Sequence, residues 1–174
     1  MAITKLEAAR RQLDAAIRLY FADDDPIAVH TLVGAAHILI TDLSKAAKLE
    51  SILDRYIVPA YRWEFEGAIR SVQNFFKHSE RDGPDATLEF DPHFTELMLL
   101  IDIEMFKELT GSATDPMRVF LTYAGATWGK AAFTAYPQDG IAEFGAMTAQ
   151  MSKHEFFAAV TELISRGRAA GTIE

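Results

Sequence analysis

Two histidines lie on one side of a predicted helix over residues 26–45. His30 and His37 are seven residues apart, so their side chains nearly eclipse after two helical turns. Gly34 lies between them, and Thr41 follows on the same strip. An imidazole exchanges its proton near neutral pH, and a glycine lets a ligand or another backbone approach closely. The axial spacing of about 10.5 Å is too long for both rings to bind one metal ion. The row predicts a pocket or interface at His30, Gly34 and His37, unless each histidine only makes a hydrogen bond at a helix boundary.

A second polar row lies on a predicted helix over residues 60–78. Arg70, Asn74 and His78 are four residues apart, so one helix face presents a cation, an amide and a titratable imidazole in order. These are the residue types of a catalytic site. The alternative is a solvated face on which Glu66 and Arg70 form an ion pair one turn apart.

Trp63 and Gly67 share the side of this second row. A tryptophan and a glycine are unexpected on a polar face that meets only water. The face therefore predicts an interface with a second copy of the chain. The opposite side carries the expected core strip, which consists of Tyr61, Phe65, Ile69, Val72 and Phe76.

Asp102 falls at the edge of the apolar strip of a predicted helix over residues 92–109. A buried carboxylate needs a partner or must take up a proton. Arg70 or one of the histidines can supply that partner if the helices pack together, whereas a slightly rotated helix leaves Asp102 in water. A related hypothesis is a small-molecule pocket, which would be lined by His30, His37, Tyr61 and Arg70.

The remaining pattern is typical of helices separated by proline and glycine. Capping carboxylates precede a proline at 25–26, 91–92 and 115–116, and Ser152 with Glu155 forms a capping box. We expect helices at 4–22, 26–45, 46–58, 60–78, 92–109, 115–128, 141–149 and from 152 onward, a polar connector over 79–91, an irregular stretch over 129–140, and a frayed tail over 166–174. This predicts one all-α domain over residues 1–174, a bundle of six to eight helices around the helix at 92–109.

Composition narrows the function classes. The 174 residues suffice for about one domain, and no cysteine is present, which excludes disulfides and thiolate sites and favours a reducing cytoplasm. The longest apolar run, residues 97–101, is far shorter than the roughly 20 residues of a membrane span, so we expect a soluble protein without membrane contact. The net charge is −8, and residues 82–115 hold nine acidic residues against one lysine. This balance disfavours nucleic acid as a partner, except a short RNA.

Known chemical motifs are missing. The chain contains no Glu-x-x-His, His-Glu-x-x-His, Gly-x-Ser-x-Gly, phosphate-binding loop or dinucleotide fingerprint. The spacing of Asp91, His93 and Glu96 is only a weak metal signal, since Asp91 has a helix to cap. We therefore expect no cofactor and no metal.

Residues 25–37 (Asp-Pro-Ile-Ala-Val-His-Thr-Leu-Val-Gly-Ala-Ala-His) and 72–82 (Val-Gln-Asn-Phe-Phe-Lys-His-Ser-Glu-Arg-Asp) resemble a group of helical bacterial proteins to which no activity is attached. More loosely, the second stretch resembles HEPN domains, small α-bundles that often dimerise and sometimes cut RNA. In those nucleases an Arg and a His, separated by four to six intervening residues, converge at the dimer cleft, commonly with a polar residue next to the Arg. Here Asn74 precedes His78 by three intervening residues and Arg70 by seven, so the spacing differs from that pattern.

Two functions follow from these observations. One is a non-catalytic dimerising or interaction module that uses Trp63, Gly67 and Asn74. The other, implied by the HEPN resemblance, is a metal-independent ribonuclease. In it His78 would act as general acid or base, Arg70 would stabilise the charge of the reacting phosphate, and Asn74 would orient the phosphate or the imidazole.

Overall fold

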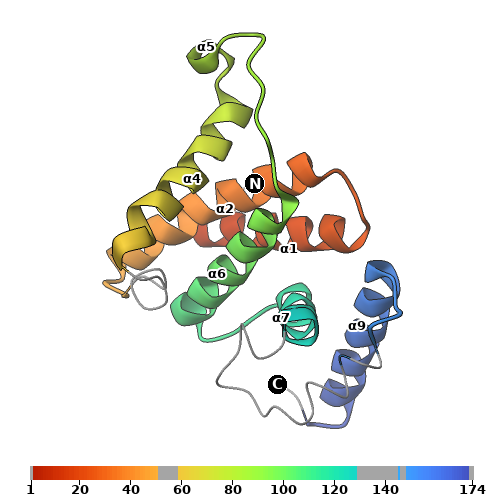
Figure 1. The fold of residues 1–174 in the computed structure, drawn as a ribbon. Helices are drawn as coiled ribbons and strands as arrows, with labels where there is room; N and C mark the ends of the chain where they lie inside the picture. The colour runs from red at the N-terminus through yellow and green to blue at the C-terminus, as the bar shows by residue number, and fades with distance from the viewer. Residues whose placement is uncertain (1, 51–58, 129–144, 146–147, 173–174) are drawn as a thin grey trace.

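The computed structural model describes residues 2–50, 59–128, 145 and 148–172, and within these ranges it contains helices and no strand. The fold is all-α, as the sequence predicts (Figure 1). The helices are α1 (Lys5–Phe21), α2 (Pro26–Ala46), α4 (Pro59–Lys77), α5 (Ser79–Asp82), α6 (Pro92–Thr110), α7 (Asp115–Trp128) and α9 (Lys153–Ala169).

Short polar residues fix where the long helices begin and end. The carboxylate of Asp25 accepts hydrogen bonds from the amides of residues 27 and 28 at the start of α2, and Asp91 accepts one from His93 at the start of α6. Ser152 and Glu155 form the predicted capping box of α9. Gly111 ends α6 with φ of 77°, a left-handed conformation that glycine adopts without a steric cost.

The central pair of helices is α2 and α6, which lie side by side and run in the same direction (Figure 1). The direction follows from two contacts: His30 meets Thr95, and His37 meets Asp102. Residues seven apart on α2 thus meet residues seven apart on α6, as expected for parallel helices with matched registers. α1 packs along α2 on another side, and α4 leans against α2.

The core is apolar and continuous across these helices. α6 contributes buried side chains on most of its circumference, including Met98, Leu99 and Ile103, so the prediction of a central helix is confirmed. Aromatic rings close the core between α1, α7 and α9, through edge and stacked contacts among Tyr20, Phe21, Phe120, Tyr123 and Phe156. Such ring contacts add stability beyond the area that they bury.

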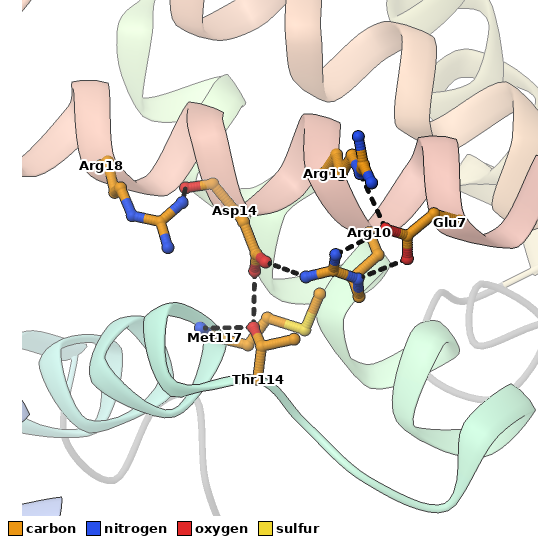
Figure 2. Close-up of polar contacts among 7 residues, drawn as sticks. All are labelled: Glu7, Arg10, Arg11, Asp14, Arg18, Thr114 and Met117. Atoms are coloured by element: carbon orange, nitrogen blue, oxygen red, sulfur yellow. Dashed lines mark hydrogen bonds and ion pairs between the residues drawn. The ribbon is translucent and has the colours of Figure 1, made fainter. Parts of the chain in front are cut away.

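A buried carboxylate ties α1 to the start of α7 (Figure 2). Asp14 accepts a hydrogen bond of 2.6 Å from the hydroxyl of Thr114 and one of 2.8 Å from Arg10. Arg10 and Arg11 also donate hydrogen bonds to the carboxylate of Glu7. These hydrogen bonds lower the pKa of Glu7 to about 2. Because both oxygens of Asp14 have partners, its burial carries a smaller desolvation penalty than that of an unpaired carboxylate.

The structure differs from the predicted elements in four places. α2 ends at Ala46, and residues 47–50, expected within a helix over 46–58, are not helical. Residues 79–82, expected in a connector, form the short helix α5, and α9 continues to Ala169, beyond the expected start of a frayed tail at 166. Tyr61, placed in the core strip of α4, is 63% exposed. The predicted helix at 46–58 from residue 51 on, the irregular stretch at 129–140 and nearly all of the helix at 141–149 lie outside the described residues.

Among the described helices, α2 alone is long and apolar enough to cross a membrane, with a mean hydropathy of 1.5. It lies between α1 and α6, and 39% of that apolar window is buried inside the protein. A core helix of a soluble protein meets the same criterion, so this feature is weak evidence for a membrane span.

Candidate functional site

A histidine–aspartate pair joins α2 to α6. The Nδ1 atom of His37 lies 2.7 Å from Oδ1 of Asp102. The Asp102 side chain is 0% exposed, and that of His37 is 13% exposed. The second carboxylate oxygen, Oδ2 of Asp102, is enclosed and has no hydrogen-bond partner. Of the partners that the sequence leaves open for Asp102, the structure selects a histidine and not Arg70.

Burial and pairing act against each other in this pair. Burial disfavours the charged imidazole, but the negative charge and hydrogen bond of Asp102 outweigh it and raise the pKa of His37. Complete burial raises the pKa of Asp102 as well, although the charge and hydrogen bond of His37 oppose that change. Both directions mean that the pair holds a proton more tightly than the separate groups would in water.

A cavity of about 320 Å³ opens beside His37. Its walls come from α2, α4 and α6, and they include Ile69 and Met105 as apolar residues. Three polar side chains of the wall have an enclosed atom without a hydrogen-bond partner among the described residues, namely Thr41 Oγ1, Ser44 Oγ and Gln73 Nε2. Buried polar groups are normally hydrogen-bonded, so three unpaired ones at one cavity need an explanation.

Gly34 allows α4 to approach α2 at the base of this cavity. An added Cβ on Gly34 would lie 2.8 Å from Nε2 and 2.9 Å from Cγ of Gln73. A group does approach this glycine closely, but it is the Gln73 side chain and not the ligand or backbone that the sequence predicts. Any larger residue at 34 would displace Gln73 and with it part of the cavity wall.

His30, the other histidine of the row, has different surroundings. Its ring is fully buried, Nδ1 lies 2.9 Å from Thr95 Oγ1, and the rings of Phe76, Phe90 and Phe94 surround it. Burial, with a smaller contribution from the charge of Lys77, lowers the pKa of His30 to about 4. His30 is thus a neutral core residue and does not line the cavity.

The row on α4 remains spread along the helix. Arg70 is exposed and binds Glu66 at 2.8 Å, and Nδ1 of His78 lies 3.4 Å from Oε1 of Glu80. Asn74 lies between them and is half-buried. Eight residues of helix separate Arg70 from His78 by about 12 Å, so one protomer does not bring the two side chains together. Tyr61 is also absent from the cavity wall, whereas His37 and Arg70 both belong to it.

Trp63 and Gly67 lie on the outer side of α4. The Trp63 residue is 79% exposed, and a Cβ on Gly67 would meet no atom within 4 Å. The sequence indicated both residues as an interface. The exposed ring of Trp63 and the open space beside Gly67 leave this face accessible to a partner.

Sequence reasoning missed Gln73 and Ser44. Ser44 follows His37 by seven residues, the same spacing that relates His37 to His30, and Gln73 follows Arg70 by one turn. Extending the row on α2 by one turn would have included Ser44, whereas Gln73 directly precedes Asn74 and lies outside the row of Arg70, Asn74 and His78. The contact of Tyr20 with Glu96 was missed as well: Glu96, which is buried, accepts a hydrogen bond of 2.7 Å from the Tyr20 hydroxyl. His93, which the sequence spacing had already placed near Glu96, lies with Nδ1 3.2 Å from its carboxylate.

The described part of the chain contains no group of three His, Asp or Glu side chains that could hold a metal ion. No family model, no curated protein and no solved structure matches this chain.

Proposed function

We propose that this protein is a non-catalytic helical module of the cytoplasm that associates with a second copy of itself through the outer face of α4. The observation that carries the proposal is the 79% exposure of Trp63. Tryptophan is enriched at the centres of protein interfaces, where its large ring supplies much of the binding energy. The lack of cysteine throughout the sequence supports a reducing compartment.

The residues around Trp63 suit a contact between two identical helices. Gly67 lies one turn after Trp63 and leaves open space above its Cα, so a second helix can approach closely there. In an antiparallel twofold contact centred on Gly67, Glu64 faces Arg70 of the second copy, since both are three residues from the centre. Both of these side chains are exposed. A twofold contact repeats this ion pair and so favours one alignment.

The charge of α4 also favours self-association. Most of the net charge of −8 lies in residues 82–115, where nine acidic residues face one lysine. α4 itself carries Arg62, Arg70 and Lys77 against Glu64 and Glu66. Two acidic molecules can therefore meet at α4 with less repulsion than elsewhere.

The test is the molar mass in solution by sedimentation equilibrium for wild type, Trp63→Ala and Tyr61→Ala. Truncation of a tryptophan anchor costs about 2 kcal/mol or more, and twofold symmetry applies the loss twice, so Trp63→Ala should weaken the dimer by about a thousandfold. Tyr61 is the matched control because it is 63% exposed on the same helix but lies about 160° around the axis from Trp63. A monomeric wild type, or equal weakening by both substitutions, would refute the proposal.

The second candidate is RNA cleavage by Arg70, Asn74 and His78. The exposure of Arg70 and of His78, which directly follows α4, favours it. An antiparallel contact centred on Asn74 would place Arg70 of one copy opposite His78 of the other. Purified protein should then cleave a short RNA without added metal, and His78→Ala should abolish the cleavage. Intact RNA after incubation with the wild-type dimer would exclude this candidate and leave the interaction module standing.

A further inference from the structure

The cavity lies between α2, α4 and α6, and Arg70 belongs both to its wall and to the face that carries Trp63. The cavity is lined by His37 and Lys45 of α2 and by Gln73 and Arg70 of α4. A volume of about 320 Å³ is within the range of small-molecule sites, roughly 300–1,000 Å³. Its combination of apolar wall and few polar groups is also typical of such sites.

The polar groups of the cavity offer more donors than acceptors. Asp102 is already paired with His37, and Glu66 with Arg70, so two of the three nearby carboxylates are engaged. The third, Asp42, is exposed at the rim. Lys45 forms no ion pair with any residue in the described ranges.

Four donors remain for a ligand. The guanidinium of Arg70 uses one N–H for Glu66, which leaves others free. The amide nitrogen of Gln73 is enclosed without a partner although the residue is only 7% exposed. The hydroxyls of Thr41 and Ser44 are enclosed and unpartnered in the same way. An enclosed donor without a partner costs free energy that a ligand acceptor would recover.

Asp102 prepares His37 to act as a further donor. It engages Nδ1 of the ring, while Nε2 makes no hydrogen bond within the described part of the chain. A carboxylate behind Nδ1 holds a proton on that nitrogen and orients the ring, as in metal and hydrolase sites. Nε2 therefore donates a hydrogen bond when the imidazole is charged, and the raised pKa of His37 favours that form. The charge of Lys45 acts on His37 as well, which places both cationic groups near one end of the cavity.

We propose that this cavity binds a small monocarboxylate, whose carboxylate group accepts hydrogen bonds from His37, Lys45 and Gln73, with Arg70 at the opening. The short apolar body of the ligand lies against Ile69 and Met105, which line the same cavity. A dianion is less favoured because Asp42 and Glu66 lie at the rim. The site binds its ligand in one protomer and does not require the contact through α4.

The test is isothermal titration of the full chain with butyrate, benzoate and inorganic phosphate at concentrations up to about 10 mM. Butyrate or benzoate should bind with one site per chain. Loss of one charged hydrogen-bond partner weakens binding by about tenfold or more, so Lys45→Gln and Arg70→Gln should each do so. Arg166→Gln is the matched control, because Arg166 and Glu162 form an equivalent exposed pair at 2.8 Å on α9.

A second readout separates binding at this cavity from binding elsewhere. Bound carboxylate should change the NMR shifts of the His37 imidazole and leave those of the exposed His154 in place. Failure of both carboxylates to bind, phosphate binding in their stead, or equal affinity in Lys45→Gln and wild type would overturn the proposal. Because Lys45 lies on α2, its substitution leaves the mass measured for the α4-mediated dimer unchanged, so the two proposals can fail independently.

Discussion

Replacement of His37 by leucine should show how much the buried pair with Asp102 contributes to stability. The substitution keeps a side chain of similar size but leaves the Asp102 carboxylate, which is 0% exposed, without a counter-charge. With Nδ1 and Oδ1 at 2.7 Å, the charge centres are about 4 Å apart, and at an effective dielectric constant of about 20 their attraction is roughly 4 kcal/mol. Measured losses on breaking buried pairs, about 3–5 kcal/mol, agree with this magnitude.

The loss should depend on pH in a defined direction. The pKa of Asp102 is raised, so acidification protonates the carboxylate of the variant and removes the penalty. The pKa of His37 is also raised, so the stability that its charge provides is fully present below about pH 6.5 and is lost as the pH rises through the folded-state pKa. The difference between wild type and His37→Leu should therefore be largest between these two folded-state pKa values and smaller on either side.

The assay is urea unfolding across this pH range, with free energies from linear extrapolation. The double variant His37→Leu/Asp102→Leu should regain most of the lost stability, because replacing a buried ion pair by apolar residues is often neutral. His93→Leu is the matched control, since the His93 side chain is 82% exposed although it also faces a carboxylate of α6, and it should have a much smaller effect. A His37→Leu loss below about 1 kcal/mol at every pH, or a double variant no more stable than the single one, would refute the reasoning.

Three further changes test the packing. Gly34→Ala places a Cβ 2.8 Å from Nε2 of Gln73 and should lower the free energy of unfolding by about 1–3 kcal/mol in a thermal unfolding experiment. Gly125→Ala is the control, because open space surrounds this position in α7, and it should be neutral or stabilising. Thr114→Val removes the 2.6 Å donor of buried Asp14 and should cost about 1–3 kcal/mol by urea unfolding. Burial lowers the pKa of His30 to about 4, so NMR should find this imidazole neutral at pH 5. The stability that the neutral ring contributes is present above about pH 6.5 and should decline as the pH falls below that value. A charged ring at pH 5 would contradict the burial argument.

Helix boundaries were the most predictable part of this fold. Asp25 with Pro26 and Asp91 with Pro92 encode the starts of α2 and α6 locally, because a capping carboxylate and a proline act within one turn. The end of α9 was not predictable in the same way. Gly167 within the sequence suggested an early end, yet the helix continues through it to Ala169, and an isolated glycine costs only about 1 kcal/mol in a helix.

The candidate site was predictable in its residue types but not in its pairings. Spacing alone made His30 and His37 equivalent, since both lie on one strip of α2. The surroundings of the two histidines differ because of α6: His30 meets Thr95 beside phenylalanine rings, whereas His37 meets Asp102. The partners are 65 residues away in the sequence. Which partner each histidine meets depends on how the helices align, and periodicity within one helix carries no information on that alignment.

The two histidine contacts between α2 and α6 favour the native alignment of these helices over alignments in which one helix is shifted along the other. If α2 were shifted by seven residues along α6, the apolar strips of the two helices would still face each other, because both strips repeat about every seven residues. A shift in one direction would place Asp102 opposite Ser44. A shift in the other direction would place Asp102 opposite His30 and Leu109 opposite His37. The His30 ring would then leave its phenylalanine neighbours. Either shifted alignment loses the buried hydrogen bond between His37 and Asp102. The polar side chains, and not the more numerous apolar ones, therefore distinguish the native alignment from the shifted ones.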